Sequence, residues 1–228
     1  MNVKVIGTGS SGNCFLIDDD LMIDAGLPYS KVKPFTKKVF AVLLTHIHGD
    51  HFNKDTIRKL YVNNEKILFV CGDFLVDDLH NVGIQDENIF VADLSLYKMR
   101  RYKIAPFSLY HDVHNYGWRI EKDGHKHFHA TDTATLDGIK AREYDSATIE
   151  CNHCYDKAID IIDKAIENGD FTHLQGAMNS HLSVQQAIDF VKKNKIKKFI
   201  PVHIGSSTKK EVIEALNKSG IEYLKGEL

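Results

Sequence analysis

The chain has 228 residues, a formal net charge of −2, 43% hydrophobic residues and 26% charged residues. These values are typical of a globular protein, and they do not favour the strongly basic surface of a dedicated nucleic-acid-binding domain. No apolar run approaches the ~20 residues that cross a bilayer, and the first residues lack the features of a signal peptide. We therefore expect a cytoplasmic protein without membrane association, folded as a single domain over residues 1–228.

Positive charge is concentrated in three short runs, at residues 31–38, 98–103 and 192–198. Each run is either a solvated face or a contact surface for a phosphate backbone. A nucleic-acid partner is therefore compatible with the mildly negative net charge.

The chain begins with short strands and polar loops. Residues 3–6 and 14–17 are expected to be strands around a glycine- and serine-rich loop that lacks the Lys-Ser/Thr and the helix of a nucleotide-binding loop. Residues 21–23 predict a buried strand that ends in Asp24. A carboxylate at this position either caps its own turn or accepts the free N–H of a ligand histidine. We favour the second role.

Three histidines and one aspartate lie within six positions, directly after an apolar run that predicts a strand. Neutral imidazole and carboxylate are the usual ligands of zinc and of neighbouring divalent metals. His46 and His48 can point the same way on extended backbone, whereas Asp50 and His51 follow Gly49, which is expected to allow a sharp turn. Two pairs of ligands would then face two metal ions. The alternative is a polar loop with histidines at chance positions.

The middle of the chain changes from alternating strands and helices to consecutive strands. The expected order is a helix capped by Asn53 or Asp55, a strand at 67–70, a helix at 73–81, a strand at 89–91, and a meander of strands at 104–110, 116–121 and 126–131. The first meander strand leads to His111 and the third to Asp132. Each places a candidate ligand at a strand end.

Histidines occupy alternate positions 125, 127 and 129 at the third meander strand, with Phe128 and Ala130 next to the last two. Because alternate residues of a strand point to opposite faces, His125, His127 and His129 share one face and Asp132 lies on the other. We expect the three histidines to be surface residues and Asp132 to be the functional one.

The last third again alternates strands and helices. The expected order is a strand at 146–150, a long amphipathic helix from about 158 to 169, no clear period at 171–179, a helix capped by Ser183, a strand at 198–202, a helix from 207 or 208, and a strand at 221–224. His181 precedes the helix that Ser183 caps, where the N-terminus attracts anions such as phosphate. His203 directly follows a strand.

Candidate ligands thus recur at strand ends along nearly the whole chain, in the order Asp24, His46, His48, Asp50, His51, His111, Asp132 and His203. The His-x-His-x-Asp-His pattern and this order resemble the motif set of the metallo-β-lactamase superfamily. The resemblance implies a mixed α/β fold, a four-layer αββα sandwich with a dinuclear metal site at one edge.

Shorter motifs narrow this resemblance. Residues 9–13, 111–112, 131–133, 150–153 and 180–183 look like those of the small YycJ/WalJ-type proteins, associated with 5′-to-3′ exonuclease action on DNA, and more distantly like ribonuclease J without its β-CASP domain. In both, a histidine equivalent to His181 precedes the last metal histidine and distinguishes these phosphodiesterases from the β-lactamases proper. Ser180 replaces the usual glycine and Cys151 a small residue, which leaves the substrate range open.

The resemblance implies roles for these residues. His46, His48 and His111 would bind one divalent ion, Asp50, His51 and His203 the other, and Asp132 would bridge; zinc, manganese and iron all suit such ligands. A water activated between the ions would attack phosphorus, oriented by Asp50, while His181 would stabilise the transition state or protonate the leaving oxygen. Asp24 would orient a ligand histidine, with Glu150 and His153 near the site.

The expected function is a metal-dependent phosphodiesterase that acts on nucleic acid, with a DNA exonuclease favoured over an RNA-specific enzyme. The alternative is hydrolysis of a small ester, thioester or cyclic phosphate on the same metals. A third class is a non-catalytic module that keeps the fold; a missing ligand would indicate it, and every expected ligand is present in the sequence. The native metal and the oligomeric state are left open.

Overall fold

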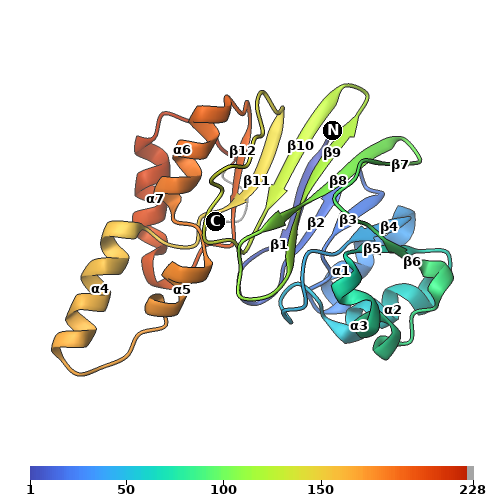
Figure 1. Cartoon of the computed structure of the whole chain (residues 1–228), viewed down its shortest axis with the longest axis horizontal. Coiled ribbons are helices and arrows are strands. Elements are labelled where there is room, and N and C mark those ends of the chain that lie inside the picture. Colours follow the sequence, from blue (N-terminus) through green and yellow to red (C-terminus); the bar gives the residue numbers. More distant parts are fainter. Residues whose placement is uncertain (225–228) are drawn as a thin grey trace. The chain divides into compact units, whose positions relative to one another are not determined.

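The computed structural model describes residues 1–224, and the chain divides into two compact units (Figure 1). The first unit comprises Met1–Ser108 and Val113–Lys122, and the second comprises Leu109–Asp112 and the chain from Asp123 onward. The expectation of a single domain stays a prediction. Within residues 1–224, no helix combines the length and the apolar character needed to cross a membrane.

One sheet of the first unit contains six strands in chain order. They are β1 (Val3–Gly7), β2 (Cys14–Ile17), β3 (Leu21–Ile23), β4 (Ala41–Leu43), β5 (Leu68–Cys71) and β6 (Ile89–Val91). The first three strands pair antiparallel, and β3 to β6 pair parallel. Parallel neighbours end at the same edge of a sheet, so the residues that follow β3 and β4 lie side by side. This pairing brings Asp24 next to Thr45.

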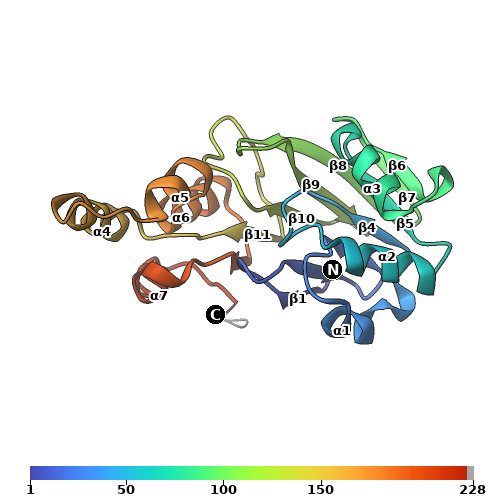
Figure 2. The ribbon, with the colours of Figure 1, turned by 90° about the horizontal axis from the view of Figure 1, so that it is seen from below.

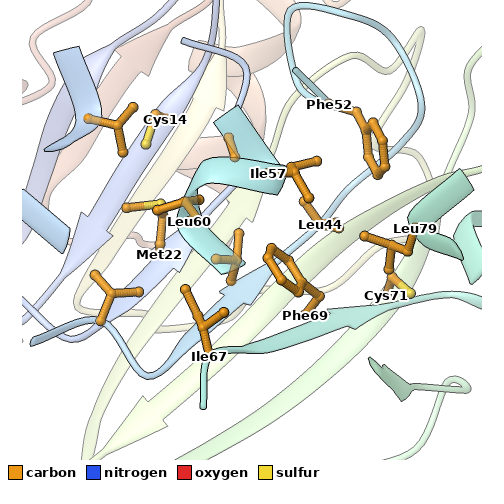
Figure 3. Close-up of a cluster of buried hydrophobic side chains, with 14 of the residues drawn as sticks. Cys14, Met22, Leu44, Phe52, Ile57, Leu60, Ile67, Phe69, Cys71 and Leu79 are labelled. Carbon is orange, nitrogen blue, oxygen red and sulfur yellow. The ribbon is translucent and has the colours of Figure 1, made fainter. Parts of the chain in front are cut away.

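Helices of the first unit cover an apolar face of this sheet. They are α1 (Tyr29–Val32), α2 (Lys54–Asn63) and α3 (Val76–Val82), with 3₁₀ segments at Lys33–Lys38, Asp73–Leu75 and Asp86–Asn88. Asn53 caps α2, as predicted, by accepting a hydrogen bond from the Thr56 N–H. Figure 3 shows Ile57 and Leu60 of α2 packed with Met22 and Phe69 of the sheet. Truncation of one such side chain to alanine costs about 2–5 kcal/mol.

The first unit contains three further strands, apart from Leu109, the last residue of one of them, which belongs to the second unit. They are β7 (Tyr97–Met99), β8 (Tyr102–Leu109) and β9 (Asn115–Lys122), and β7 pairs antiparallel with β8. The Tyr102 hydroxyl donates to Asp20 at 2.5 Å, and the Lys122 amine lies 2.6 Å from Asp18. These bonds attach β8 and β9 to the turn between β2 and β3.

The second unit contains three parallel strands and four helices. They are β10 (His125–Ala130), β11 (Ser146–Glu150), β12 (Phe199–Val202), α4 (Tyr155–Glu167), α5 (Leu174–Ser180), α6 (Val184–Asn194) and α7 (Lys209–Lys218), with a 3₁₀ turn at Ser206–Thr208. Ser183 caps α6, as predicted, in a reciprocal capping box with Gln186. The parallel pairing brings the carboxyl ends of β10, β11 and β12 to one edge.

In this unit the structure adds a helix where the sequence showed no pattern, and the prediction of a strand at 221–224 is wrong. Helix α5 occupies most of the stretch that showed no period, because a single buried leucine, Leu174, is enough to dock a helix of two turns. Residues 221–224 form no strand, since Tyr223 makes one isolated bridge to Phe199. Within the unit, α4 lies farther from β10 to β12 than α6 does (Figures 1 and 2), and Ala158 is its one buried residue.

The expectation that the β10 histidines lie on the surface is wrong for two of the three. His127 and His129 are completely buried, as are Phe128 and Ala130 between and after them, whereas His125 is exposed. Parallel strands are commonly covered on both faces, so alternation along β10 does not distinguish a solvent-exposed face from a buried one. Hydroxyl groups of β11 lie against the two buried imidazole rings in place of solvent.

His127 lies 2.8 Å from the Ser146 hydroxyl and 3.1 Å from the Thr148 hydroxyl, which is also 2.6 Å from His129. Burial lowers the pKa of His127 to about 3, so the ring is neutral near neutral pH. The two histidines are therefore part of a polar network inside the unit.

Candidate metal centre

In the first unit, a buried carboxylate holds the histidine loop. Asp24 follows β3 with a backbone φ of 56°, a conformation that non-glycine residues adopt rarely and mostly at constrained sites. Its carboxylate accepts the Thr45 N–H at 2.9 Å, the Thr45 hydroxyl at 2.9 and 3.0 Å, and the His51 Nδ1–H at 2.6 Å. The structure thus shows the contact expected between Asp24 and a histidine of the loop.

The imidazoles of this loop lie against one another. The ring centroid of His46 is 4.8 Å from that of His48 and 4.3 Å from that of His51, and the Asp50 Oδ2 atom is 3.7 Å from the His51 Nε2 atom. The Nδ1 atoms of His46 and His51 face Thr45 and Asp24, at 3.0 and 2.6 Å. A histidine whose Nδ1 is fixed in this way presents Nε2 as a metal donor. The loop therefore has the donor chemistry of a divalent-metal site.

Sequence reasoning missed the role of Asn13, which is completely buried at the end of the glycine-rich loop. Its side-chain nitrogen lies 2.8 Å from the His51 Nε2 atom and 3.2 Å from the Asp50 carboxylate, and its side-chain oxygen accepts from the Gly9 N–H. Asn13 thus joins this loop to the histidine loop. The available signal in the sequence was an asparagine directly after a loop with glycines at 7, 9 and 12.

The turn of the histidine loop does not depend on Gly49. The chain does turn at residues 47–51, as expected, but the φ of Gly49 is not positive and a Cβ built there meets no atom within 4 Å. Gly26 is the constrained position, because a Cβ there would lie 1.7 Å from the carbonyl oxygen of Asp50. The strand-end segment after β3 and the histidine loop approach too closely for any side chain at 26.

In the second unit, candidate ligands gather at the carboxyl edge of β10, β11 and β12. Asp132 and His203 follow β10 and β12 with φ values of 58° and 51°, the conformation also found at Asp24. The His203 Nδ1 atom lies 2.5 Å from Asp132 and 3.6 Å from Glu150. Burial lowers the pKa of His203, but the charges and hydrogen bonds of Asp132 and Glu150 together outweigh burial and raise the pKa to about 10.

Glu150, the last residue of β11, anchors this group. Its carboxylate is completely buried and accepts the Thr133 N–H at 2.6 Å, the Leu182 N–H at 3.1 Å and the His181 Nδ1–H at 2.9 Å. Burial lowers the pKa of His181, but the hydrogen bond and the charge of Glu150 raise it overall. Sequence reasoning placed Glu150 near the site without a role; the structure shows it as the counterpart of Asp24.

His111 is oriented by the end of α5. Its Nδ1–H donates to the Ser180 carbonyl oxygen at 3.0 Å, which leaves Nε2 3.1 Å from Asp112 and 3.9 Å from Asp132. Burial lowers the pKa of His111, so the neutral, metal-binding form of the ring is favoured. The His111 and His181 ring centroids are 5.3 Å apart.

The three remaining candidate histidines have different surroundings. His114 is exposed and stacks on Phe74, with ring centroids 5.5 Å apart, and His173 is exposed and lies 3.0 Å from the Ser207 hydroxyl. His153 is buried, and its Nδ1 atom makes no hydrogen bond among the described residues. Burial lowers the pKa of His153. The charge of Glu150 acts to raise this pKa, and the charge of His181 acts to lower it.

The donor atoms of the second unit fit a divalent ion. Asp132, Glu150, His181 and His203 each offer one nitrogen or oxygen atom, and all four atoms lie within 4.8 Å of one another. Carboxylate oxygens with imidazole nitrogens are a common ligand set for zinc and manganese. Both units thus carry metal-type donors, and the individual ligand roles of the seven expected residues stay predictions.

Residues 21–204 match the family described as the β-lactamase superfamily domain. Among curated proteins, none matches the chain. Solved structures with the same fold include the metallo-β-lactamase fold protein YhfI from Bacillus subtilis, at 19% identity and a TM-score of 0.77, over 97% of this chain and 94% of the other.

Two further solved structures with this fold are named as a tRNase and a diphosphatase. The short form of human tRNase Z is 16% identical with a TM-score of 0.65, over 90% of this chain and 93% of the other. A diphosphatase from the PhnP family is 15% identical with a TM-score of 0.70, over 97% and 93%. The α/β fold expected from the sequence is confirmed. The chain belongs to the β-lactamase superfamily, whose members are generally metal-dependent hydrolases.

Proposed function

We propose that this chain is a metal-dependent phosphodiesterase of the small YycJ/WalJ-like branch, acting on nucleic acid as an exonuclease, with DNA favoured over RNA. The observation that carries the proposal is the hydrogen bond of His181 to the buried Glu150, beside Asp132 and His203. A histidine held in this way can supply a proton beside the metal-type donors. Cleavage of a phosphodiester uses such a proton donor, and a site made of metal ligands alone does not provide one.

The contacts of His181 define its chemistry. Because Nδ1–H donates to Glu150, the opposite ring nitrogen, Nε2, is available to a substrate, and 18% of the side chain is exposed. When a phosphodiester is cleaved, the leaving group is an alkoxide oxygen that must gain a proton. A positioned histidine can donate this proton. Glu150 orients the ring for this transfer. His181 is therefore proposed as the group that protonates the leaving oxygen or stabilises the transition state.

The metal donors are proposed to be His46, His48, Asp50 and His51 of the first unit and His111, Asp132 and His203 of the second. Two ions, of zinc or manganese with iron as a further option, would supply Lewis-acid polarisation of the phosphoryl oxygen and a water of lowered pKa. Asp24 orients His51 through the 2.6 Å hydrogen bond, and Asp50 orients the attacking water.

Exposed positive charge on the first unit supports a polyanionic substrate. Lys31, Lys33, Lys37 and Lys38 are all exposed, on α1 and on the 3₁₀ segment that follows it. Lysines in this arrangement can neutralise successive phosphates of a nucleic acid, and binding would then weaken as salt increases. The names of tRNase Z and of the PhnP-family diphosphatase, which share the fold, are consistent with a phosphorus-containing substrate.

A nuclease assay combined with metal analysis tests the proposal. Wild-type protein loaded with manganese or zinc is incubated with 5′-phosphorylated DNA and RNA, single-stranded and duplex, next to Asp50→Ala, His181→Ala and the exposed-carboxylate control Asp55→Ala. We expect Asp50→Ala to lose cleavage, His181→Ala to lose about 10²- to 10⁴-fold in kcat, and Asp55→Ala to match wild type. Equal rates for Asp50→Ala and wild type would refute the proposal.

A second candidate is hydrolysis of a small ester, thioester or cyclic phosphate on the same donors. The likeness to a PhnP-family diphosphatase favours it, because that protein's name indicates cleavage of a diphosphate. A panel of such substrates in the same assay separates the two: turnover of a small ester without any cleavage of DNA or RNA would favour this candidate.

A further inference from the structure

A hollow of about 400 Å³ in the second unit adjoins His111 and is not used by the roles described above. It is lined by Tyr110, His111, Asp112, Gly176, Asn179 and Ser180. The Tyr110 side chain is 69% exposed. We propose that this hollow binds an unpaired nucleobase of the substrate next to the scissile phosphodiester, with Tyr110 as the stacking platform. The proposal rests on the proposed function and extends it from the scissile phosphate to the base beside it.

Tyr110 is a fixed platform because its backbone is anchored on both sides. Its N–H donates to the Thr133 hydroxyl at 3.1 Å, and its carbonyl oxygen accepts the Ala134 N–H at 2.8 Å. The ring therefore projects from a backbone that is already ordered. A tyrosine side chain has only two torsion angles to order on binding, and every base offers a π-face to it.

The last turn of α5 supplies the polar side of the hollow. The Asn179 side-chain nitrogen donates to the Gln175 carbonyl oxygen at 3.1 Å, which leaves its second N–H and its side-chain oxygen for the edge of a base. The next residue, Ser180, accepts the hydrogen bond that orients His111. One turn of helix thus lines the hollow and positions an expected metal ligand, so a base held there has a defined distance to the reacting phosphate.

Gly176 keeps the hollow open. It lies within α5, its φ is not positive, and a Cβ built on it meets no atom within 4 Å. A larger side chain at this position can therefore be accommodated by the helix and would occupy the space of the base. Glycine inside a helix is otherwise unfavourable, so the substitution is not expected to impair folding.

A stacking site of this kind predicts a preference for substrates with an unpaired terminal nucleotide. Stacking is tolerant of base identity, so sequence preference should be small, and a blunt duplex should bind less well than a single strand because its terminal base must first unpair.

Binding without metal tests the hollow directly. Oligonucleotides with the fluorescent base 2-aminopurine at one end or the other are titrated into metal-free protein, where stacking on tyrosine quenches the fluorescence. We expect quenching with wild type and Tyr110→Phe, and its loss with Tyr110→Ala and Gly176→Leu, with binding about 5- to 150-fold weaker. Tyr155→Ala removes an exposed tyrosine of α4 outside the hollow and should match wild type. Equal quenching in all five proteins would overturn the proposal.

Kinetics with intact and abasic substrates separate this proposal from the proposed function. With an intact terminal base, Tyr110→Ala should raise KM and leave kcat unchanged, whereas with an abasic terminal nucleotide it should match wild type. Cleavage of the intact substrate by Tyr110→Ala with the KM of wild type would overturn the hollow alone. Absence of cleavage of any phosphodiester by wild type would overturn the proposed function, while the quenching measurement still decides whether the hollow binds a base.

Discussion

The two units present metal-type donors in different ways. In the first unit the donors are neighbours in sequence, residues 46–51, and one loop after β4 carries them all. In the second, His111, Asp132, His181 and His203 come from four separate places, after β8, β10, α5 and β12. A contiguous loop brings its donors together locally, and Asp24 and Asn13 then hold it in place. A dispersed group forms only when the strands pair in the correct register.

Both groups nevertheless use the same device, a buried carboxylate that accepts backbone N–H groups and one histidine Nδ1–H. Asp24 does this in the first unit and Glu150 in the second. The difference lies in what each carboxylate joins. Asp24 connects adjacent parallel strands, whereas Glu150 also holds the segment before α6 through Leu182. We therefore expect the second group to depend more on its anchor than the first group does.

The largest expected effect is loss of the anchor of the second group. Glu150→Ala leaves the Thr133 and Leu182 N–H groups without their acceptor and removes the partner of His181, which should lower the free energy of unfolding by about 3–5 kcal/mol. Urea denaturation of the metal-free protein measures it. Asp55→Ala removes an exposed carboxylate, 69% of whose side chain is accessible, and should cost less than about 1 kcal/mol. Equal losses in the two variants would contradict the anchoring role of Glu150.

An intermediate effect is expected from the close approach in the first group. Gly26→Ala places a Cβ against the Asp50 carbonyl oxygen and must displace the histidine loop, at a cost of about 3 kcal/mol in unfolding free energy and with weaker metal binding. Gly49→Ala, in the loop itself, should change stability by less than about 1 kcal/mol because its Cβ has open space. Calorimetric metal titration and urea denaturation measure both. Similar results for the two variants would mean that the approach at Gly26 does not position the loop.

The smallest effect concerns the histidines that belong to neither group. The pKa of His127 is about 3 in the folded chain and about 6.5 when unfolded, so between these values only the unfolded chain binds the proton. Stability should therefore fall with decreasing pH in this window, by up to about 1.4 kcal/mol per pH unit. His127→Gln should remove this part of the slope, as measured by urea denaturation at pH values of about 7 and 5. His125→Gln, on the exposed end of the same strand, should leave the slope unchanged, and an identical slope in all three proteins would contradict a neutral His127.

The sequence alone determined the fold class, because strand-end ligands and alternating helix and strand patterns are local features. It also determined the histidine loop and the capping residues Asn53 and Ser183, since a strand end and a helix start are specified by residues within a few positions. The candidate positions Asp132 and His203 were found as residues that follow strands and His181 as a residue before a capped helix, whereas their roles came from the resemblance.

Only the tertiary structure decided which groups touch. The parallel register of β10, β11 and β12 places Asp132, Glu150 and His203 together, and no local pattern encodes that register. Burial of both faces of β10 reversed the expectation for His127 and His129, because alternation describes direction and not what covers each face. The constraint on Gly26 likewise depends on a contact between segments that α1 and β4 separate in the chain, which only the folded chain forms.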